Sequence, residues 1–137
     1  MNEENFNFQF TQKDTPVIRK QIIKDLKRII KYVKKEAPKS TVGLWGSFAY
    51  GEGRVSVIKG KIIYSSDFDI VIVTNSFLDY FKVLRNKKLK NIEKELGLKI
   101  SIIITNEFRI KKRDTSVRIE KLPARPIVTS LLIEYTV

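Results

Sequence analysis

The chain has 137 residues, of which 42% are hydrophobic and 31% charged, a composition that indicates one folded domain rather than a disordered segment. It contains no cysteine and no histidine, which excludes disulfides, thiolate or imidazole metal sites and a histidine base. Any metal must therefore be bound by oxygen ligands, as magnesium or manganese is. The formal net charge of +12 favours an anionic partner such as nucleic acid, although a lysine-rich, thermophile-like surface would give the same balance.

The sequence contains no pattern typical of a membrane segment. Its apolar runs are far shorter than the roughly 18 to 20 residues that a membrane helix needs. Residues 1–5 are polar and acidic, unlike a secretory signal. We therefore expect a cytoplasmic protein without a membrane partner.

The first part of the chain predicts an arm followed by a long helix. Residues 1–14 form a polar N-terminal arm in which Phe6, Phe8 and Phe10 recur at period two, as in a short edge strand, although a frayed terminus would also fit. Thr15-Pro16 marks a helix start, and Pro38 ends the helix. One helix face is apolar and the other is rich in lysine; the apolar residues are Ile18, Ile22, Leu26, Ile29 and Val33, and the lysines are Lys20, Lys24, Lys27, Lys31 and Lys34. The lysine face is either a solvated surface or a track for a phosphate backbone.

The middle of the chain alternates between strand and turn patterns. Residues 41–45 predict a strand. Residues 54–65 predict an inserted β-hairpin, with strands at 54–58 and 61–64 around a turn at Lys59-Gly60. Residues 67–74 are rich in isoleucine and valine and predict a central strand.

The remainder predicts a helix, a strand and a mixed tail. Residues 77–96 are helical with an interruption near 85–88 and a helix end at Gly97, followed by a strand over 98–105. We expect a short helix or loop over 106–114, a turn bracketed by Pro123 and Pro126, and a last strand over 127–137, in which 130–135 could instead be helical. This order indicates a single α+β or α/β domain, residues 1–137, built around one central sheet.

Two motifs combine residue types that bind phosphate and metal. Gly46-Ser47 directly follows a strand, where glycine lets a phosphate approach the backbone and the serine hydroxyl adds a donor; a helix opening there would aim backbone amides at an anion. Ser66-Asp67-Phe68-Asp69 opens the central strand. Since side chains alternate along a strand, Asp67 and Asp69 should point to one face with Cα atoms about 6.5 to 7 Å apart. Two such carboxylates can converge on one or two divalent cations.

In this order the two motifs resemble the minimal nucleotidyltransferases of the DNA polymerase beta superfamily. That family combines a hydrophobic strand, Gly-Ser, a small helix with alanine and glycine, and Ser-Asp-x-Asp followed by apolar residues. The matching residues here are Leu44, Gly46, Ser47, Ala49, Gly51, Ser66, Asp67, Asp69, Ile70 and Val71. The resemblance covers residues 41–105 and implies a nucleotidyltransferase-like fold, with a central mixed sheet flanked by helices.

The resemblance also implies a reaction. Asp67 and Asp69 would bind Mg²⁺ or Mn²⁺ and act as the catalytic residues. Gly46, Ser47 and Ser66 would bind a nucleoside triphosphate, and ATP is the one we expect first. A nucleoside monophosphate would pass to an acceptor hydroxyl on a protein or a small molecule. Catalysis would consist mainly of positioning and charge neutralisation.

Two departures from the family pattern concern phosphate binding. Residues 48–66 separate the two motifs, roughly twice the spacing in minimal members, and the inserted hairpin accounts for the extra length. Tyr50 stands where many members have arginine. Lys59, Lys61 or Arg54 on the hairpin could supply phosphate contacts, or could simply be solvated.

A third departure affects catalysis. Ser101 stands where the family has a third carboxylate, and a serine hydroxyl neither takes a proton near neutral pH nor binds a metal as a carboxylate does. Glu107, Asp114 or Glu120 could substitute from the following segment. The alternative function is therefore a catalytically impaired nucleotide- or nucleic-acid-binding protein.

The partners remain open at this point. By resemblance, a helical toxin-type protein is an acceptor to consider, since many short relatives act beside one. A third hypothesis is a structural subunit whose basic face docks an acidic partner. A terminal strand over 131–137 could also pair across a homodimer.

Overall fold

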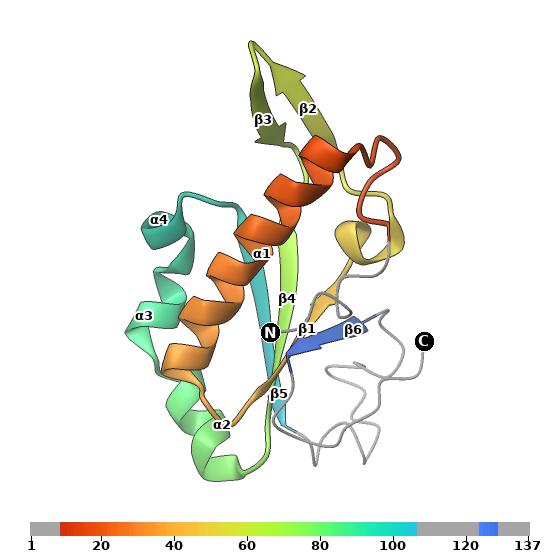
Figure 1. The fold of residues 1–137 in the computed structure, drawn as a ribbon. Helices are drawn as coiled ribbons and strands as arrows, with labels where there is room; N and C mark the ends of the chain where they lie inside the picture. The colour runs from red at the N-terminus through yellow and green to blue at the C-terminus, as the bar shows by residue number, and fades with distance from the viewer. Residues whose placement is uncertain (1–8, 107–123, 129–137) are drawn as a thin grey trace.

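The computed structural model describes residues 9–106 and 124–128 (Figure 1). Its elements, in chain order, are α1 (Pro16–Glu36), β1 (Thr41–Trp45), the short 3-10 helix η2 (Ser47–Tyr50), β2 (Val55–Ile58), β3 (Lys61–Tyr64), β4 (Phe68–Thr74), α2 (Phe77–Leu84), α3 (Lys87–Lys90), α4 (Ile92–Leu96), β5 (Ile100–Asn106) and β6 (Ala124–Val128). None of the helices in these residues is long and apolar enough to cross a membrane.

The main sheet is mixed, as expected for the α+β class. Its strand order is β5-β4-β1-β6; β4 and β5 run parallel, and β1 runs antiparallel to both of its neighbours. The prediction of a central strand is confirmed, because β4 lies between two partners and every residue in it except Asp69 is buried. The strand begins at Phe68, one residue later than predicted.

Helix α1 forms where the sequence places it. The hydroxyl of Thr15 accepts a hydrogen bond from the backbone N–H of Ile18 at 3.4 Å, Pro16 occupies the first helical position, and the helix ends at Glu36 ahead of Pro38. The predicted apolar stripe is buried: Ile18, Ile22, Leu26, Ile29 and Val33.

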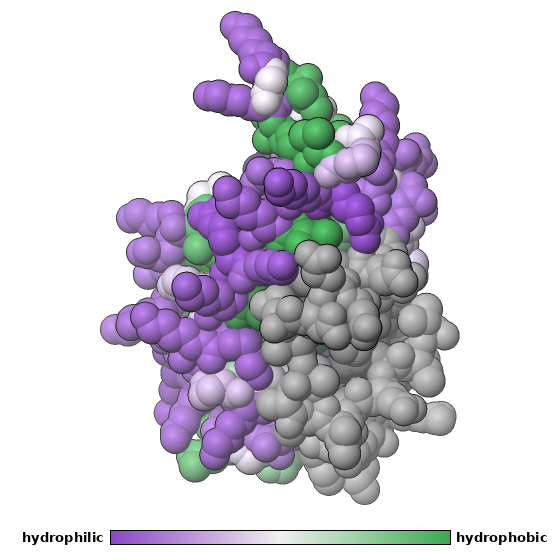
Figure 2. All heavy atoms as spheres, viewed as in Figure 1, coloured by the Kyte–Doolittle hydropathy of each residue, from purple (hydrophilic) through white to green (hydrophobic). Residues whose placement is uncertain are grey.

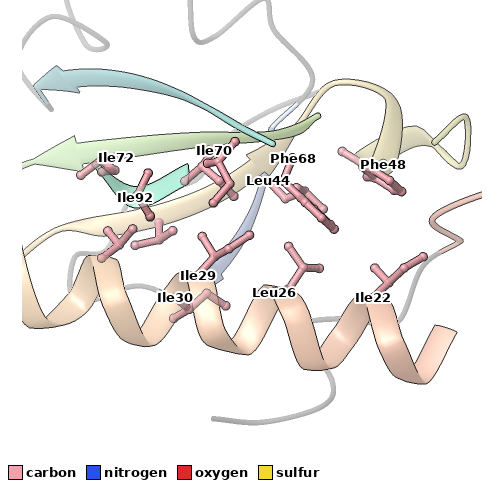
Figure 3. Close-up of a cluster of buried hydrophobic side chains, with 14 of the residues drawn as sticks. Ile22, Leu26, Ile29, Ile30, Leu44, Phe48, Phe68, Ile70, Ile72 and Ile92 are labelled. Atoms are coloured by element: carbon pink, nitrogen blue, oxygen red, sulfur yellow. The ribbon is translucent and has the colours of Figure 1, made fainter. Parts of the chain in front are cut away.

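The core lies between α1 and one face of the sheet. Figure 3 shows Leu26 and Ile29 of α1 pointing toward Leu44, Ile70 and other side chains of the sheet. Buried residues of α2, α3 and α4 belong to the same cluster, namely Val83, Leu89 and Ile92. The helices of the described residues therefore cover a single sheet face.

The predicted hairpin is present and forms a separate two-stranded sheet. Val55 pairs with Tyr64 and Ile58 with Lys61, leaving Lys59 and Gly60 as a two-residue turn with φ values of 52° and 77°. Positive φ at both positions is the requirement of a type I′ turn, which glycine satisfies most readily. The hairpin projects beyond the main sheet in Figure 1.

The predicted helix over 77–96 is broken into three pieces. The side chain of Asn86 accepts a hydrogen bond from the N–H of Leu89 at 2.9 Å and thereby starts α3, within the predicted interruption. Gly97 ends α4 in the left-handed conformation, as predicted. The following strand starts at Ile100, two residues later than predicted.

The prediction of a turn at Pro126 was wrong. Pro126 lies inside β6, opposite Gly43, next to a register shift in the pairing with β1. Strand β6 is at the edge of the sheet, where proline is tolerated because one side of the strand needs no partner. Strand β6 also starts three residues before the predicted last strand; residues 107–123 and 129–137, which hold the other predictions for the tail, lie outside the described residues.

The N-terminal arm is described from Gln9 onward, so Phe6 and Phe8 lie outside the described residues. Phe10 is fully buried, and its carbonyl accepts a hydrogen bond from the N–H of Gly53 at 3.0 Å. Residues 9–14 are not a strand. The hydrogen bond between Gly53 and Phe10 ties the arm to the segment that precedes the hairpin.

Candidate functional site

The two sequence motifs meet at Gly46 and Asp69. Trp45, the last residue of β1, pairs with Asp69 of β4, so the chain leaves β1 directly beside this carboxylate. Gly46 has φ 75° and ψ −155°, a conformation available essentially to glycine alone. A Cβ atom on this residue would lie 2.1 Å from Oδ2 of Asp69. Glycine is therefore required here both by the backbone conformation and by the carboxylate that occupies the space.

The carboxylates of Asp67 and Asp69 are close enough to influence each other. Asp67 is exposed and immediately precedes β4, whereas Asp69 is half-buried within it. Burial, and to a smaller extent the negative charge of Asp67, raises the pKa of the Asp69 carboxyl above its ordinary value. Because Phe68 and Ile70 belong to the core beneath α1, alternation directs Asp69 to the sheet face away from the helices.

Ser101 lies beside Asp69 on the neighbouring strand. The parallel pairing of β4 and β5 brings Asp69 and Ser101 into register, and adjacent strands lie about 4.8 Å apart. Ser101 is exposed. The position at which the resemblance would place a third carboxylate is thus adjacent to Asp69, and it carries a hydroxyl.

The residues present fit a hard divalent cation. Within the described ranges, neither carboxylate of the pair accepts a hydrogen bond or joins an ion pair, and no group of three or more acidic, histidine or cysteine residues occurs. Two close carboxylates of like charge, one of them half-buried, gain from a cation between them. Magnesium commonly takes one or two carboxylates and completes its shell with phosphate oxygens and water.

Ser47 and Ser66 face a common pocket. Both line a depression of about 810 Å³ whose other walls include Arg54 and residues 11–13. The hydroxyl of Ser66 accepts a hydrogen bond from the N–H of Arg54 at 2.8 Å, so it helps to fix the base of the hairpin. Of the hairpin cations considered from sequence, Arg54 lines this pocket and Lys59 and Lys61 do not.

Three aromatic rings pack together and connect the Gly-Ser turn to the Asp-x-Asp segment. Phe48 follows Ser47, Phe68 stands between the two aspartates, and their rings stack with centroids 4.7 Å apart and an interplanar angle of 12°. Tyr64 of the hairpin packs edge-on against both, at 5.9 Å from Phe48 and 5.0 Å from Phe68. Edge-to-face and offset-stacked pairs at these separations are favourable.

Tyr64 is held in turn by a buried carboxylate. Its hydroxyl donates a hydrogen bond to Oδ2 of Asp25 at 2.6 Å, and Asp25, only 3% exposed, also accepts from Gln21 and Arg28. Burial, followed by this hydrogen bond, raises the pKa of Tyr64. Sequence reasoning missed Asp25. The available signal was a charged residue within the apolar stripe, three residues after Ile22.

Glu107, Asp114 and Glu120, the suggested substitutes for the third carboxylate, lie outside the described residues. Tyr50 is half-buried at the end of η2.

Comparisons with known protein families, with curated proteins and with solved structures find no match.

Proposed function

We propose that this chain is a small Mg²⁺-dependent nucleotidyltransferase with a nucleotidyltransferase-like domain. The observation that carries the proposal is the contact of Gly46 with the carboxylate of Asp69, which joins a Gly-Ser turn to an Asp-x-Asp strand. Neither motif is specific alone, whereas a Gly-Ser turn in contact with the second of two neighbouring carboxylates suits the binding of a metal–polyphosphate complex.

The residues divide into two roles. Asp67 and Asp69 would bind Mg²⁺, which neutralises phosphate charge and polarises the phosphorus–oxygen bonds when bound. Gly46 would let the backbone come close to the nucleotide, and Ser47 and Ser66 line the same pocket. The aromatic cluster keeps these groups in a fixed relation, which matters because positioning supplies most of the catalysis in such reactions.

The reaction is transfer of a nucleoside monophosphate from ATP to an acceptor hydroxyl. The acceptor oxygen forms a bond to the α-phosphorus, the bond from that phosphorus to the β-phosphate oxygen breaks, and pyrophosphate leaves. The hydroxyl proton passes to solvent, since Ser101 cannot take it at neutral pH. Because Ser101 does not act as a base, we expect the transfer to be slow. A protein hydroxyl or a small molecule is the acceptor.

The test distinguishes nucleotidyl transfer from phosphoryl transfer. Purified protein and Mg²⁺ are added to a cell extract with ATP labelled at the α-phosphate or, in parallel, at the γ-phosphate. The proposal predicts that only the α-label becomes attached to an acceptor, and that Asp67→Asn and Asp69→Asn abolish attachment. Asp79→Asn, in the first turn of α2, is the matched control and should retain it. Attachment of the γ-label that depends on the added protein and is lost in Asp69→Asn would contradict the proposal.

A second candidate function is nucleic-acid binding through α1. A groove of about 760 Å³ along this helix is lined by Lys20, Lys24, Lys27 and Lys31. Figure 2 shows hydrophilic side chains along the helix. Lys34 is not part of that groove, because its ammonium donates to the carbonyl of Ser40 at 2.6 Å. If the lysines contact phosphates, affinity for duplex DNA or RNA should fall steeply with salt. An affinity independent of salt would exclude this function.

A further inference from the structure

The pocket beside Ser47 brings together two cationic side chains from separate segments. Lys13 belongs to the N-terminal arm and Arg54 to the residues just before β2, and both line the same depression as Ser47 and Ser66. Its volume of about 810 Å³ is within the usual range of small-molecule sites. Its polar lining suits a charged ligand better than an apolar one.

The two cations are exposed and not neutralised by neighbours. In residues 9–106, the ion pairs join Arg19 to Asp14 and Arg28 to Asp25, and neither includes Lys13 or Arg54. Asp14, next to Lys13 in sequence, is held by Arg19 at 3.0 Å and turned to a different partner. Glu52 also lines the pocket but forms no ion pair with either cation.

The walls that carry these cations are fixed by backbone contacts. The N–H of Gly53 donates to the carbonyl of Phe10 at 3.0 Å, which ties the arm to the residue before Arg54. The N–H of Arg54 donates to the hydroxyl of Ser66 at 2.8 Å, and its carbonyl accepts from Ser65 at 2.9 Å. The pocket is therefore preformed, so a ligand would not have to order these segments on binding.

The position of the pocket selects the ligand. Neither Asp67 nor Asp69 lines the pocket, but Ser47 directly follows the glycine that contacts Asp69, and Ser66 directly precedes Asp67, so the pocket and the carboxylate pair are joined through the chain at two points. A polyanion that extends from a metal at the carboxylates into this pocket would meet Lys13 and Arg54 beside Ser47 and Ser66. Arginine and lysine are the side chains that bind phosphate most often.

We propose that this pocket binds the polyphosphate chain of the nucleotide, with Lys13 and Arg54 contacting its phosphate oxygens. The identity of the ligand rests on the proposed function, whereas the pocket and its charges do not. The inserted hairpin thereby acquires a role at its base: it presents Arg54, while the tip residue Lys59 lies away from the pocket.

The experiment measures binding by calorimetry with two probes, ATP with and without Mg²⁺ and inorganic tripolyphosphate without metal. Wild type is compared with Lys13→Ala and Arg54→Ala, and with Lys59→Ala as a control that removes an equal charge from the exposed hairpin turn. All three substitutions are at exposed positions, and unchanged thermal denaturation confirms folding. We expect Lys13→Ala and Arg54→Ala each to weaken both probes about ten-fold, and Lys59→Ala to leave them unchanged.

The outcomes separate the two proposals. If wild type binds Mg²⁺-ATP but neither pocket variant differs from Lys59→Ala, the pocket assignment is overturned and the proposed function stands. If tripolyphosphate binds and both pocket variants lose it, while ATP binds equally well with and without Mg²⁺, the pocket stands and the proposed function fails. If wild type binds neither probe, both are overturned.

Discussion

Replacing Gly46 by alanine tests the geometry on which the candidate site depends. The new Cβ would lie 2.1 Å from Oδ2 and 2.9 Å from Cγ of Asp69, so the carboxylate must move. The backbone strain of alanine at φ 75° and ψ −155° costs about 1–3 kcal/mol. Displacing Asp69 from its rotamer adds about 0.5–1.5 kcal/mol. We expect a loss of about 1.5–4.5 kcal/mol in the free energy of unfolding, measured in urea.

Two comparisons isolate the contact from the strain. Gly60 has nearly the same φ, 77°, but a Cβ there would meet no atom within 4 Å, so Gly60→Ala should cost only about 1 kcal/mol. In an Asp69→Ala background, Gly46→Ala should cost less than it does in wild type, by about the 0.5–1.5 kcal/mol of the displaced carboxylate. Equal costs at Gly46 and Gly60, with no coupling to Asp69, would refute the close approach of the two motifs.

Three further predictions concern the surroundings of the site. Tyr64→Phe keeps the ring packing but removes the hydrogen bond to buried Asp25, and should lower the free energy of unfolding by about 1.5–3 kcal/mol in urea; no change would mean that this bond is not formed. Because the pKa of Asp69 is raised on folding, ionising it opposes folding, and stability falls as pH rises from the unfolded pKa through the folded one. In chelator, Asp69→Asn should therefore melt above wild type at neutral pH, by a margin that vanishes as pH falls below the unfolded value; a constant margin would contradict this cause. Ser101→Asp places a third carboxylate beside Asp69 and should tighten Mn²⁺ binding at least about ten-fold in a calorimetric titration. Unchanged affinity would mean that residues 69 and 101 do not contribute to one metal site.

Local patterns predicted much of the fold because their causes are local. The cap at Thr15, the stripe of α1 and the turn at Lys59-Gly60 depend on residues within a few positions of each other, and all three are found. Pro126 was misassigned because proline favours turns by itself, and only the sheet order shows that its strand is at an edge.

The sequence predicted where Gly46 and Asp69 lie along the strands, but not the residues that pack beneath them. Strand propensity is a local property, so Asp69 lies on the predicted central strand, whereas the register that brings Ser101 of β5 beside it is a tertiary contact. The hydrogen bond from Tyr64 to Asp25 joins residues 39 positions apart, and no periodicity connects them. The pocket shared by Lys13 and Arg54 likewise depends on a contact between the arm and the hairpin base that only the tertiary structure specifies.

The most direct test of the account is a calorimetric titration with ATP, with and without Mg²⁺, of wild type, Asp69→Asn and the control Asp79→Asn. We predict binding that requires Mg²⁺ in wild type and in the control, and an affinity at least about ten-fold weaker in Asp69→Asn. Binding that ignores the metal, or that Asp69→Asn retains in full, would contradict the claim that Gly46, Ser47, Asp67 and Asp69 form a metal–nucleotide site.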